Sequence, residues 1–264
     1  MKNETNIARF CTVCFVLLSQ ITFVSGQTSG NEKQVTHYQQ CWTSINSTMR
    51  FSNHWGVIAD FHVRTDDYFN DIYFYFLRIG AANWIKGKYP VALGYAHLWQ
   101  APKDGGQTWS DENRIYQQWS ASHTEGIVKV LNRIRTEQRW KDVIVDDAKT
   151  DDKQFSFRLR YLATFEIQVF RNKKIPSLVV SDEMLVQFGK DVGLNTFDQN
   201  RLFLGLKVPI NSTLCFDIGY MNILQQKSSG YQYDLSNVFR LFFYYTPDFR
   251  NKEKEIPEYL DGAE

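Results

Sequence analysis

The residues best placed to do chemistry are charged side chains that recur at every second position. Arg133, Arg135 and Glu137 follow one another in this way, and Arg158 and Arg160 repeat the pattern further along the chain. Because successive side chains of a β-strand point to opposite faces, each set shares one face of a strand. An arginine fork pairs with a carboxylate through parallel hydrogen bonds. We expect first a structural ion-pair network, second a constriction selective for anions, and third a catalytic group.

The segment from Phe155 to Val169 indicates which element carries these charges. Its odd positions are all apolar or aromatic, and its even positions include Arg158, Arg160 and Glu166. This alternation predicts a strand with one apolar face and one charged face. The segment is longer than the about 5–6 residues usual in soluble proteins. It is long enough to cross a bilayer at a tilt, which takes roughly 9–11 residues.

Similar segments fill the chain. Tight connections such as 51–54 and 210–211 alternate with long polar ones such as 100–111 and 141–153, which is typical of outer-membrane barrels. Closure removes the unpaired strand edges that lipid does not tolerate. Because bacterial single-chain barrels normally have an even strand number, we predict an all-β fold, a closed antiparallel transmembrane β-barrel of about 12 strands, with about 10 as the second choice. The segments are Tyr38–Met49, Trp55–Arg64, Asp71–Trp84, Tyr89–Trp99, Glu112–Ser122, Gly126–Trp140, Gln154–Val169, Ser177–Phe188, Gln199–Pro209, Ser212–Leu224 and Ser236–Tyr245.

The kind of polar residue indicates which face lines the interior. Ten arginines but only two lysines, Lys129 and Lys207, fall on the polar faces, and the other lysines cluster in turns and tails. A confined, ion-paired interior favours arginine, because its planar fork is weakly hydrated and pairs with carboxylates. We therefore interpret the charged face as the lumen and the apolar face as lipid-facing. The opposite orientation would describe a soluble, lipocalin-like carrier. The predicted lumen network is Asp60, His62, Arg64, Arg78, Glu112, Arg114, Arg133, Arg135, Glu137, Arg139, Arg158, Arg160, Glu166, Glu183, Arg201, Asp217 and Arg240.

Tryptophans fall at or near the ends of the predicted strands. This placement favours aromatic girdles at the two membrane interfaces. The residues are Trp42, Trp55, Trp84, Trp99, Trp119 and Trp140, with Trp109 in a loop.

The chain divides into four predicted parts. Residues 1–26 combine a weakly basic start, an apolar run and small residues before the following glutamine, which is typical of a cleaved secretory signal. Residues 27–37 form an N-terminal lead, 38–246 the barrel, and 247–264 a polar tail with two prolines. We therefore expect an exported chain.

Two of the four cysteines leave with the signal. For the remaining Cys41 and Cys215, two unlinked strand residues are favoured over a single disulfide. The chain carries 30 basic and 29 acidic residues, and this balance argues against nucleic-acid binding.

An enzyme would need a histidine within reach of a nucleophile or an acid. His62 falls on the inward face between Asp60 and Arg64, and His97 falls on the lipid-facing register. The Asp60-x-His62 spacing favours an orienting pair, and no Gly-x-Ser-x-Gly, His-Glu-x-x-His or Cys-x-x-Cys motif occurs. The acidic segment 146–153 lacks the spacing of an EF-hand. We therefore predict no catalytic residue, no cofactor and no metal site.

Several short motifs are distinctive as a set. They are Gln40-Cys-Trp-Thr, Leu93-Gly-Tyr-Ala, Glu112-Asn-Arg-Ile-Tyr-Gln-Gln-Trp, Asn132-Arg-Ile-Arg-Thr-Glu-Gln-Arg, Phe157-Arg-Leu-Arg-Tyr, Asp182-Glu, Phe197-Asp-Gln-Asn-Arg-Leu, Phe216-Asp-Ile-Gly-Tyr-Met-Asn and Asn237-Val-Phe-Arg-Leu. With these motifs the chain resembles domain of unknown function 2490 (DUF2490), a family of predicted Gram-negative outer-membrane barrels. The resemblance covers residues 40–245 and implies a barrel and an outer-membrane location, but no activity. Such barrels usually end on an aromatic residue of the last strand, whereas here residues 246–264 follow Tyr245.

These observations lead to one expectation for function and two alternatives. We expect a monomeric barrel of the outer membrane with no specific activity assigned and an Arg/Glu-lined lumen largely filled by ion pairs; within that, a narrow anion-preferring pore is the leading activity. The expected partners are outer-membrane lipid and a small anionic solute. The alternatives are a structural or surface-interaction barrel that acts through its loops, and an outer-membrane enzyme that modifies lipid or peptide.

Overall fold

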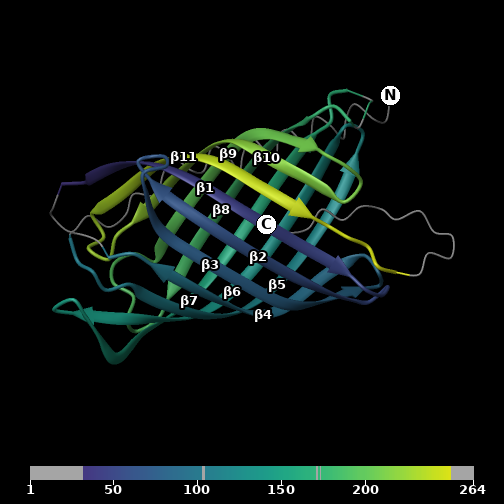
Figure 1. Ribbon diagram of the computed structural model, residues 1–264. Coiled ribbons are helices and arrows are strands. Elements are labelled where there is room, and N and C mark those ends of the chain that lie inside the picture. The colour runs from purple at the N-terminus through teal and green to yellow at the C-terminus, as the bar shows by residue number, and fades with distance from the viewer. Residues whose placement is uncertain (1–31, 103–104, 171, 173, 251–264) are drawn as a thin grey trace.

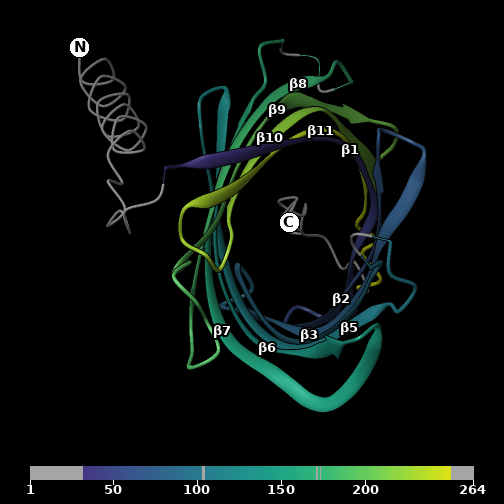
Figure 2. The ribbon, with the colours of Figure 1, turned by 90° about the vertical axis from the view of Figure 1, so that its left-hand side faces the viewer.

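The computed structural model describes residues 32–102, 105–170, 172 and 174–250. Within these residues, eleven strands form one closed barrel without a helix (Figure 1; Figure 2 looks into it from one end). The predicted signal peptide and most of the predicted tail lie outside the described residues. The strands are β1 (Gln34–Arg50), β2 (Trp55–Asp66), β3 (Asp71–Ile85), β4 (Tyr89–Gln100), β5 (Ser110–Glu125), β6 (Val128–Val145), β7 (Ala148–Ile167), β8 (Ser177–Phe188), β9 (Phe197–Pro209), β10 (Leu214–Gln226) and β11 (Gln232–Tyr245).

The strand number of the described barrel corrects the prediction of twelve or ten. Consecutive strands pair antiparallel, and the barrel closes through a parallel pairing of β1 with β11, from Gln34 opposite Gln232 to Ser47 opposite Tyr245. With an odd number of alternating strands, the first and the last run in the same direction, so their pairing must be parallel. Each predicted segment coincides with one strand. The even number was wrong because it assumed antiparallel closure.

The barrel has two different ends. What we term the turn end carries the connections at 51–54, 86–88, 126–127, 168–176 and 210–213. The loop end carries those at 67–70, 101–109, 146–147, 189–196 and 227–231. The described chain therefore enters β1 at the loop end and leaves β11 at the turn end.

One predicted loop, 141–153, is mostly strand. β6 and β7 continue through it as a hairpin that projects beyond the other strands (teal in Figure 1), and only Asp146 and Asp147 form its turn. Their φ angles of 50° and 56° are those of a type I′ turn, which matches the twist of the two strands. The prediction of a loop was wrong because it rested on polar composition. A hairpin exposed to solvent on both faces shows no apolar alternation, so its strands carry no signal of that kind.

The polarity of the barrel is the reverse of that of a soluble barrel. In β7, Arg158 and Arg160 point inward and are buried, whereas Leu159 and Tyr161 alternate with them and are exposed to 37% and 45%. The charged face lines the lumen and the apolar face covers the outside. Every described strand contributes a large exposed apolar side chain, as in Ile45, Phe61, Ile79, Leu93, Ile115, Ile134, Leu159, Met184, Leu204, Tyr220 and Phe239.

Two tryptophans depart from the expected girdles. Trp42 and Trp84 point into the barrel and are buried, because both occupy the inward register of their strands. Trp55, Trp99 and Trp119 are exposed on the outside. Position along a strand therefore does not suffice to assign a tryptophan to an interface, since the face also matters.

Glycines make room for aromatic rings against the inner wall. Gly80 lies opposite Gly94 in the β3–β4 register, and Tyr116 packs over both. A Cβ atom at Gly80 would lie 2.2 Å from the Tyr116 hydroxyl, and one at Gly94 would lie 2.6 Å from its ring. Gly205 makes the same room for Phe203, whose ring would lie 2.4 Å from an added Cβ atom. Glycine is needed here for close approach.

Cys41 and Cys215 do not form a disulfide with each other. Cys41 lies opposite Phe239 of β11, whereas Cys215 lies opposite Tyr244, nearer to the turn end.

Candidate functional site

The predicted lumen network lies at inward-facing positions but divides between two regions. The inner faces of β5–β8, which we term the ion-pair wall, carry Glu112, Arg114, Arg133, Arg135, Glu137, Arg139, Arg158, Arg160, Glu166 and Glu183. The inner faces of β9–β11 and β1–β4, which we term the aromatic wall, carry Asp60, His62, Arg64, Arg78, Arg201, Asp217 and Arg240.

Glu137 is the centre of the ion-pair wall. Its carboxylate accepts hydrogen bonds from Arg158 at 2.9 Å and from Arg160 at 2.8 Å, and a nitrogen of Arg114 lies 3.6 Å away. Only 3% of the Glu137 surface is exposed. Guanidinium groups from β5 and β7 thus converge on one buried carboxylate from β6.

Two further carboxylates extend the ion-pair wall. Glu183 of β8 accepts hydrogen bonds from Arg133 at 2.6 Å and from Arg160 at 2.7 Å. Glu112 of β5 accepts bonds from Arg139 at 2.6 and 3.1 Å. Because Arg160 also contacts the central Glu137, the ion pairs form one connected network. A buried charge is tolerated only when it is paired, and each of the three carboxylates, Glu112, Glu137 and Glu183, is held by at least two arginines.

The arginines of the aromatic wall stack on rings. Arg64 lies 3.5 Å from the ring centroid of Trp42 and 3.9 Å from that of Phe74. Arg240 lies 4.1 Å from the ring centroid of Phe203. Each such cation–π contact contributes about 0.5–2 kcal/mol, more when it is shielded from water.

Carboxylates are fewer on the aromatic wall. Asp60 pairs with Arg78, and Asp217 lies 3.4 Å from Arg240. Arg64 has no carboxylate within ion-pair distance among the described residues.

The two histidines singled out from the sequence lie in different surroundings. The ring of His62 packs edge-on against Phe76 at 5.1 Å and Phe242 at 5.4 Å between centroids. Asp60, its neighbour on the strand face, is engaged by an arginine instead. His97 faces the outside of the barrel, with its ring 4.3 Å from that of a tryptophan, its Nδ1 atom 2.8 Å from the amide oxygen of Asn113 and its Nε2 atom 3.8 Å from Asp111.

Two partners of the arginines were not predicted from the sequence, one because it is uncharged and one because it lies at a break in the alternation. Asp198 accepts a hydrogen bond from Arg158 at 2.9 Å, and Gln118 accepts one from Arg135, also at 2.9 Å. Asp198 was not predicted because it is the extra residue of a β-bulge in β9, where Leu185 lies opposite Gln199 and Val186 opposite Phe197, so the alternation of β9 is broken there. Gln118 was not predicted as an arginine partner because only charged residues were considered. It shares the inward register of Glu112 and Arg114 in β5.

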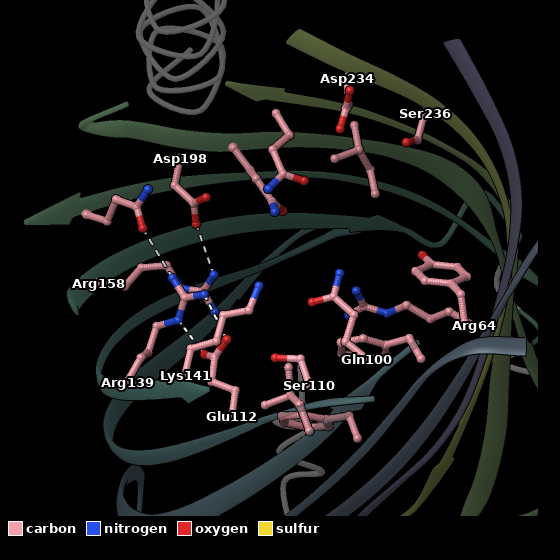
Figure 3. Close-up of a pocket in the computed structure, with 18 of the residues that line it drawn as sticks. Arg64, Gln100, Ser110, Glu112, Arg139, Lys141, Arg158, Asp198, Asp234 and Ser236 are labelled. Atoms are coloured by element: carbon pink, nitrogen blue, oxygen red, sulfur yellow. Dashed lines mark hydrogen bonds and ion pairs between the residues drawn. The ribbon is translucent and has the colours of Figure 1, made fainter. Parts of the chain in front are cut away.

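A cavity of about 1090 Å³ lies between the two walls. Arg139, Arg158 and Asp198 gather on one side of it, and Arg64 lies across from them (Figure 3). Twelve basic and eight acidic residues line the cavity, so its surface carries an excess of positive charge.

The cavity opens at one end of the barrel. Its rim is formed by residues of the loop end, including Thr108, Asp147 and Lys227. Its lining includes Asn46 of β1, whereas the buried Trp84 and Tyr116 nearer to the turn end do not line it. The cavity therefore opens at the loop end and stops before the turn end.

A clamp of hydrogen bonds holds the projecting hairpin to the β4–β5 loop at this rim. The Asp147 carboxylate accepts hydrogen bonds from the backbone N–H groups of Thr108 at 2.9 Å and Gln107 at 3.0 Å. These N–H groups hold the pKa of Asp147 below its ordinary value. Nearby, Lys149 pairs with Asp142 at 3.2 Å.

Comparison with known proteins gives a family. A family model described as a protein of unknown function, DUF2490, matches residues 39–237. The chain belongs to this family. An uncharacterized protein of Methylorubrum extorquens is 31% identical over 139 residues, which cover 51% of this chain and 57% of that protein. No solved structure matches the chain.

Proposed function

We propose that this chain is an integral outer-membrane barrel that admits small anionic solutes into its lumen from the loop end. The observation that carries the proposal is the reversed polarity, with large apolar side chains on the outside of every described strand and ion pairs inside. In water such a surface would expose far more contiguous apolar area than soluble monomers normally show. In a bilayer the same surface is solvated by lipid, and closure pairs the backbone groups of the strands.

The charge of the lumen favours anions. The cavity surface has more basic than acidic residues, and the acidic ones Glu112, Glu183 and Asp198 are already held by arginines. Positive walls of low polarisability focus the field and raise the local concentration of anions. Because the cavity stops before the turn end, passage through the barrel requires a rearrangement of inward side chains there. A narrow or gated pore follows, with its long loops facing outward and its turns facing the periplasm.

Gel mobility and fractionation test the location. In Gram-negative cells, the protein should sediment with the outer membrane and stay there in high salt. The unboiled band should run faster than the boiled band, because a closed barrel resists detergent unfolding. Recovery in the soluble periplasmic fraction without a mobility shift would overturn the membrane proposal and favour a soluble carrier.

Planar-bilayer recordings in a salt gradient test the anion preference. The wild type should show a small conductance whose reversal potential favours the anion. The triple variant Arg133→Glu/Arg135→Glu/Arg158→Glu should shift that potential toward cations. The matched control is the reversal of exposed turn-end lysines, Lys86→Glu/Lys88→Glu/Lys174→Glu, which should leave selectivity unchanged.

A gentler variant guards against loss of folding in the triple variant. Gln187 accepts a hydrogen bond from Arg139 at 3.2 Å, and Gln187→Glu keeps this acceptor while adding one negative charge to the lumen. It should lower the anion preference. If the wild type is silent and Arg133→Glu/Arg135→Glu/Arg158→Glu changes only heat stability, a purely structural barrel replaces the pore.

A further inference from the structure

We propose that Arg64, together with Arg201, forms a binding site for the phosphate group of a small organic phosphate that enters from the loop end. The inference rests on the proposed entry of anions into the lumen and names their class and the residues that bind them. It starts from the fact that Arg64 is neutralised differently from the other arginines of the lumen.

Arg64 lines the cavity with its guanidinium held between two rings. Trp42 and Phe74 lie 3.5 and 3.9 Å from it, and its polar neighbour is the Tyr73 hydroxyl. Among the described residues no carboxylate lies within ion-pair distance, and the Nε atom, which is shielded from solvent, has no hydrogen-bond partner. A buried donor without an acceptor is rare, and it indicates an acceptor supplied from outside the chain.

The ring of Trp42 brings a second guanidinium to the same place. Arg201 lies 5.2 Å from that ring; it donates to Gln199 at 2.9 and 2.7 Å and to Glu183 at 3.4 Å, so these contacts fix its positive charge beside Arg64. Trp42 is fixed in turn, because its Nε1 atom donates to Gln40 at 3.0 Å. The arrangement is therefore preorganised, and an anion that binds there does not have to order the side chains first.

The chemistry of the site favours a phosphate. A guanidinium fork matches the spacing of phosphate oxygens and binds them through two hydrogen bonds. A dianion gains roughly twice the Coulomb energy of a monoanion at the same distance, and Arg114 and Arg160 also act on Arg64 as positive charges. The rings of Trp42 and Phe74 offer apolar surface to an organic group, and the cavity of about 1090 Å³ can hold one.

Calorimetric titration of the refolded barrel in detergent tests the site, with inorganic phosphate as the probe and acetate as the monoanion. Phosphate should bind the wild type, and Arg64→Gln should weaken it by about tenfold or more, the loss expected for a charge-assisted hydrogen-bond pair. Arg64→Lys keeps the charge but not the guanidinium fork, so its affinity for phosphate should lie between those of the wild type and Arg64→Gln.

The matched control is Arg50→Gln. Arg50 also stacks on a tryptophan, 4.8 Å from the ring of Trp84, but it lies at the turn end and does not line the cavity. Its variant should bind phosphate as the wild type does. Equal affinity of Arg64→Gln and Arg50→Gln, equal affinity for acetate and phosphate, or no binding to the wild type at millimolar phosphate would each overturn the assignment.

The titration also separates this inference from the proposed function. It needs a folded barrel but no membrane. If the protein fractionates as soluble and phosphate still binds in an Arg64-dependent way, the membrane proposal fails and the phosphate site stands. If the protein is an outer-membrane barrel and phosphate does not bind, the membrane proposal stands and the phosphate site fails.

Discussion

The ion-pair wall and the aromatic wall both carry arginines inside the barrel, but they neutralise them by different means. On the ion-pair wall, Arg160 contacts both Glu137 and Glu183, so each group depends on several others. On the aromatic wall, Arg64 rests between the rings of Trp42 and Phe74 without a carboxylate among the described residues. The first arrangement makes a rigid network, and the second leaves hydrogen-bonding capacity for a ligand.

The comparison explains why the proposed anion site lies on the aromatic wall. Carboxylates of the ion-pair wall already accept hydrogen bonds from five of its arginines, so an incoming anion would compete with them there. These are Arg114, Arg133, Arg139, Arg158 and Arg160. Rings attract a guanidinium without using its N–H groups. The aromatic wall therefore holds Arg64 in place while its Nε donor is not used by the chain, and a binding surface for anions needs such a donor.

The largest expected effect comes from replacing one arginine of each wall by leucine. Arg160→Leu leaves Glu137 and Glu183 with too few partners, and breaking such buried pairs costs about 3–5 kcal/mol. Arg64→Leu strands no carboxylate; it removes two cation–π contacts of about 0.5–2 kcal/mol each, but the leucine packs between the same rings and offsets part of that loss, so the destabilisation should be smaller than for Arg160→Leu. Urea unfolding in detergent micelles, followed by tryptophan fluorescence, measures both.

The control for this pair is Glu166→Gln. Glu166 is half-buried at the turn end and lies 3.4 Å from Lys207. Glu166→Gln should lower the free energy of unfolding by less than Arg160→Leu does. If Arg64→Leu destabilises the barrel as much as Arg160→Leu does, the distinction between the two walls is wrong.

The next effect tests how the aromatic wall is built. Gly80→Ala places a Cβ atom against the Tyr116 hydroxyl and the carbonyl oxygen of Leu93, and overpacking of this kind costs about 1–3 kcal/mol. In a Tyr116→Leu background the clash with the hydroxyl is gone, so the same substitution should cost less. A double-mutant cycle on the unfolding free energy measures this coupling. A coupling of zero would show that Tyr116 does not depend on the glycine.

Much of the barrel could be predicted from local patterns. Alternation located each strand, because the side-chain period of a strand is set by its backbone geometry. The preference for arginine over lysine separated the face that became the lumen from the one that became the outside. Ser177–Phe188 was placed at its observed bounds because polar loops flank it on both sides.

Closure and contacts across the lumen could not be predicted in this way. The strand number depends on how β1 meets β11, and no local pattern in either strand indicates a parallel partner. The division into two walls depends on which side chain faces Arg64, and Trp42 and Phe74 come from separate strands. Asp198 was not predicted because it is the extra residue of a bulge in β9, which breaks the alternation on which the prediction rested.

The smallest expected effect is the loss, at low pH, of the hydrogen bonds by which Asp147 holds the β4–β5 loop at the rim. The folded pKa of Asp147 is lowered by the backbone N–H groups of Thr108 and Gln107, so the stabilisation that it gives is fully present above its unfolded pKa of about 3.9. This stabilisation is lost as the pH falls below the unfolded pKa and through the lower pKa of the folded state. Hydrogen exchange at Gln107 and Thr108, corrected for intrinsic rates, should therefore lose protection below about pH 4, while the strands keep theirs.

A neutral side chain at this position separates the clamp from a general effect of acid. In Asp147→Asn the amide cannot carry the charge that both N–H groups share, so protection at Gln107 and Thr108 should already be low at neutral pH and change little with acid. Asp151→Asn removes an exposed carboxylate from the same hairpin and should behave as the wild type. If Asp147→Asn keeps full protection, the β4–β5 loop is held by its other contacts and the Asp147 carboxylate is not the clamp.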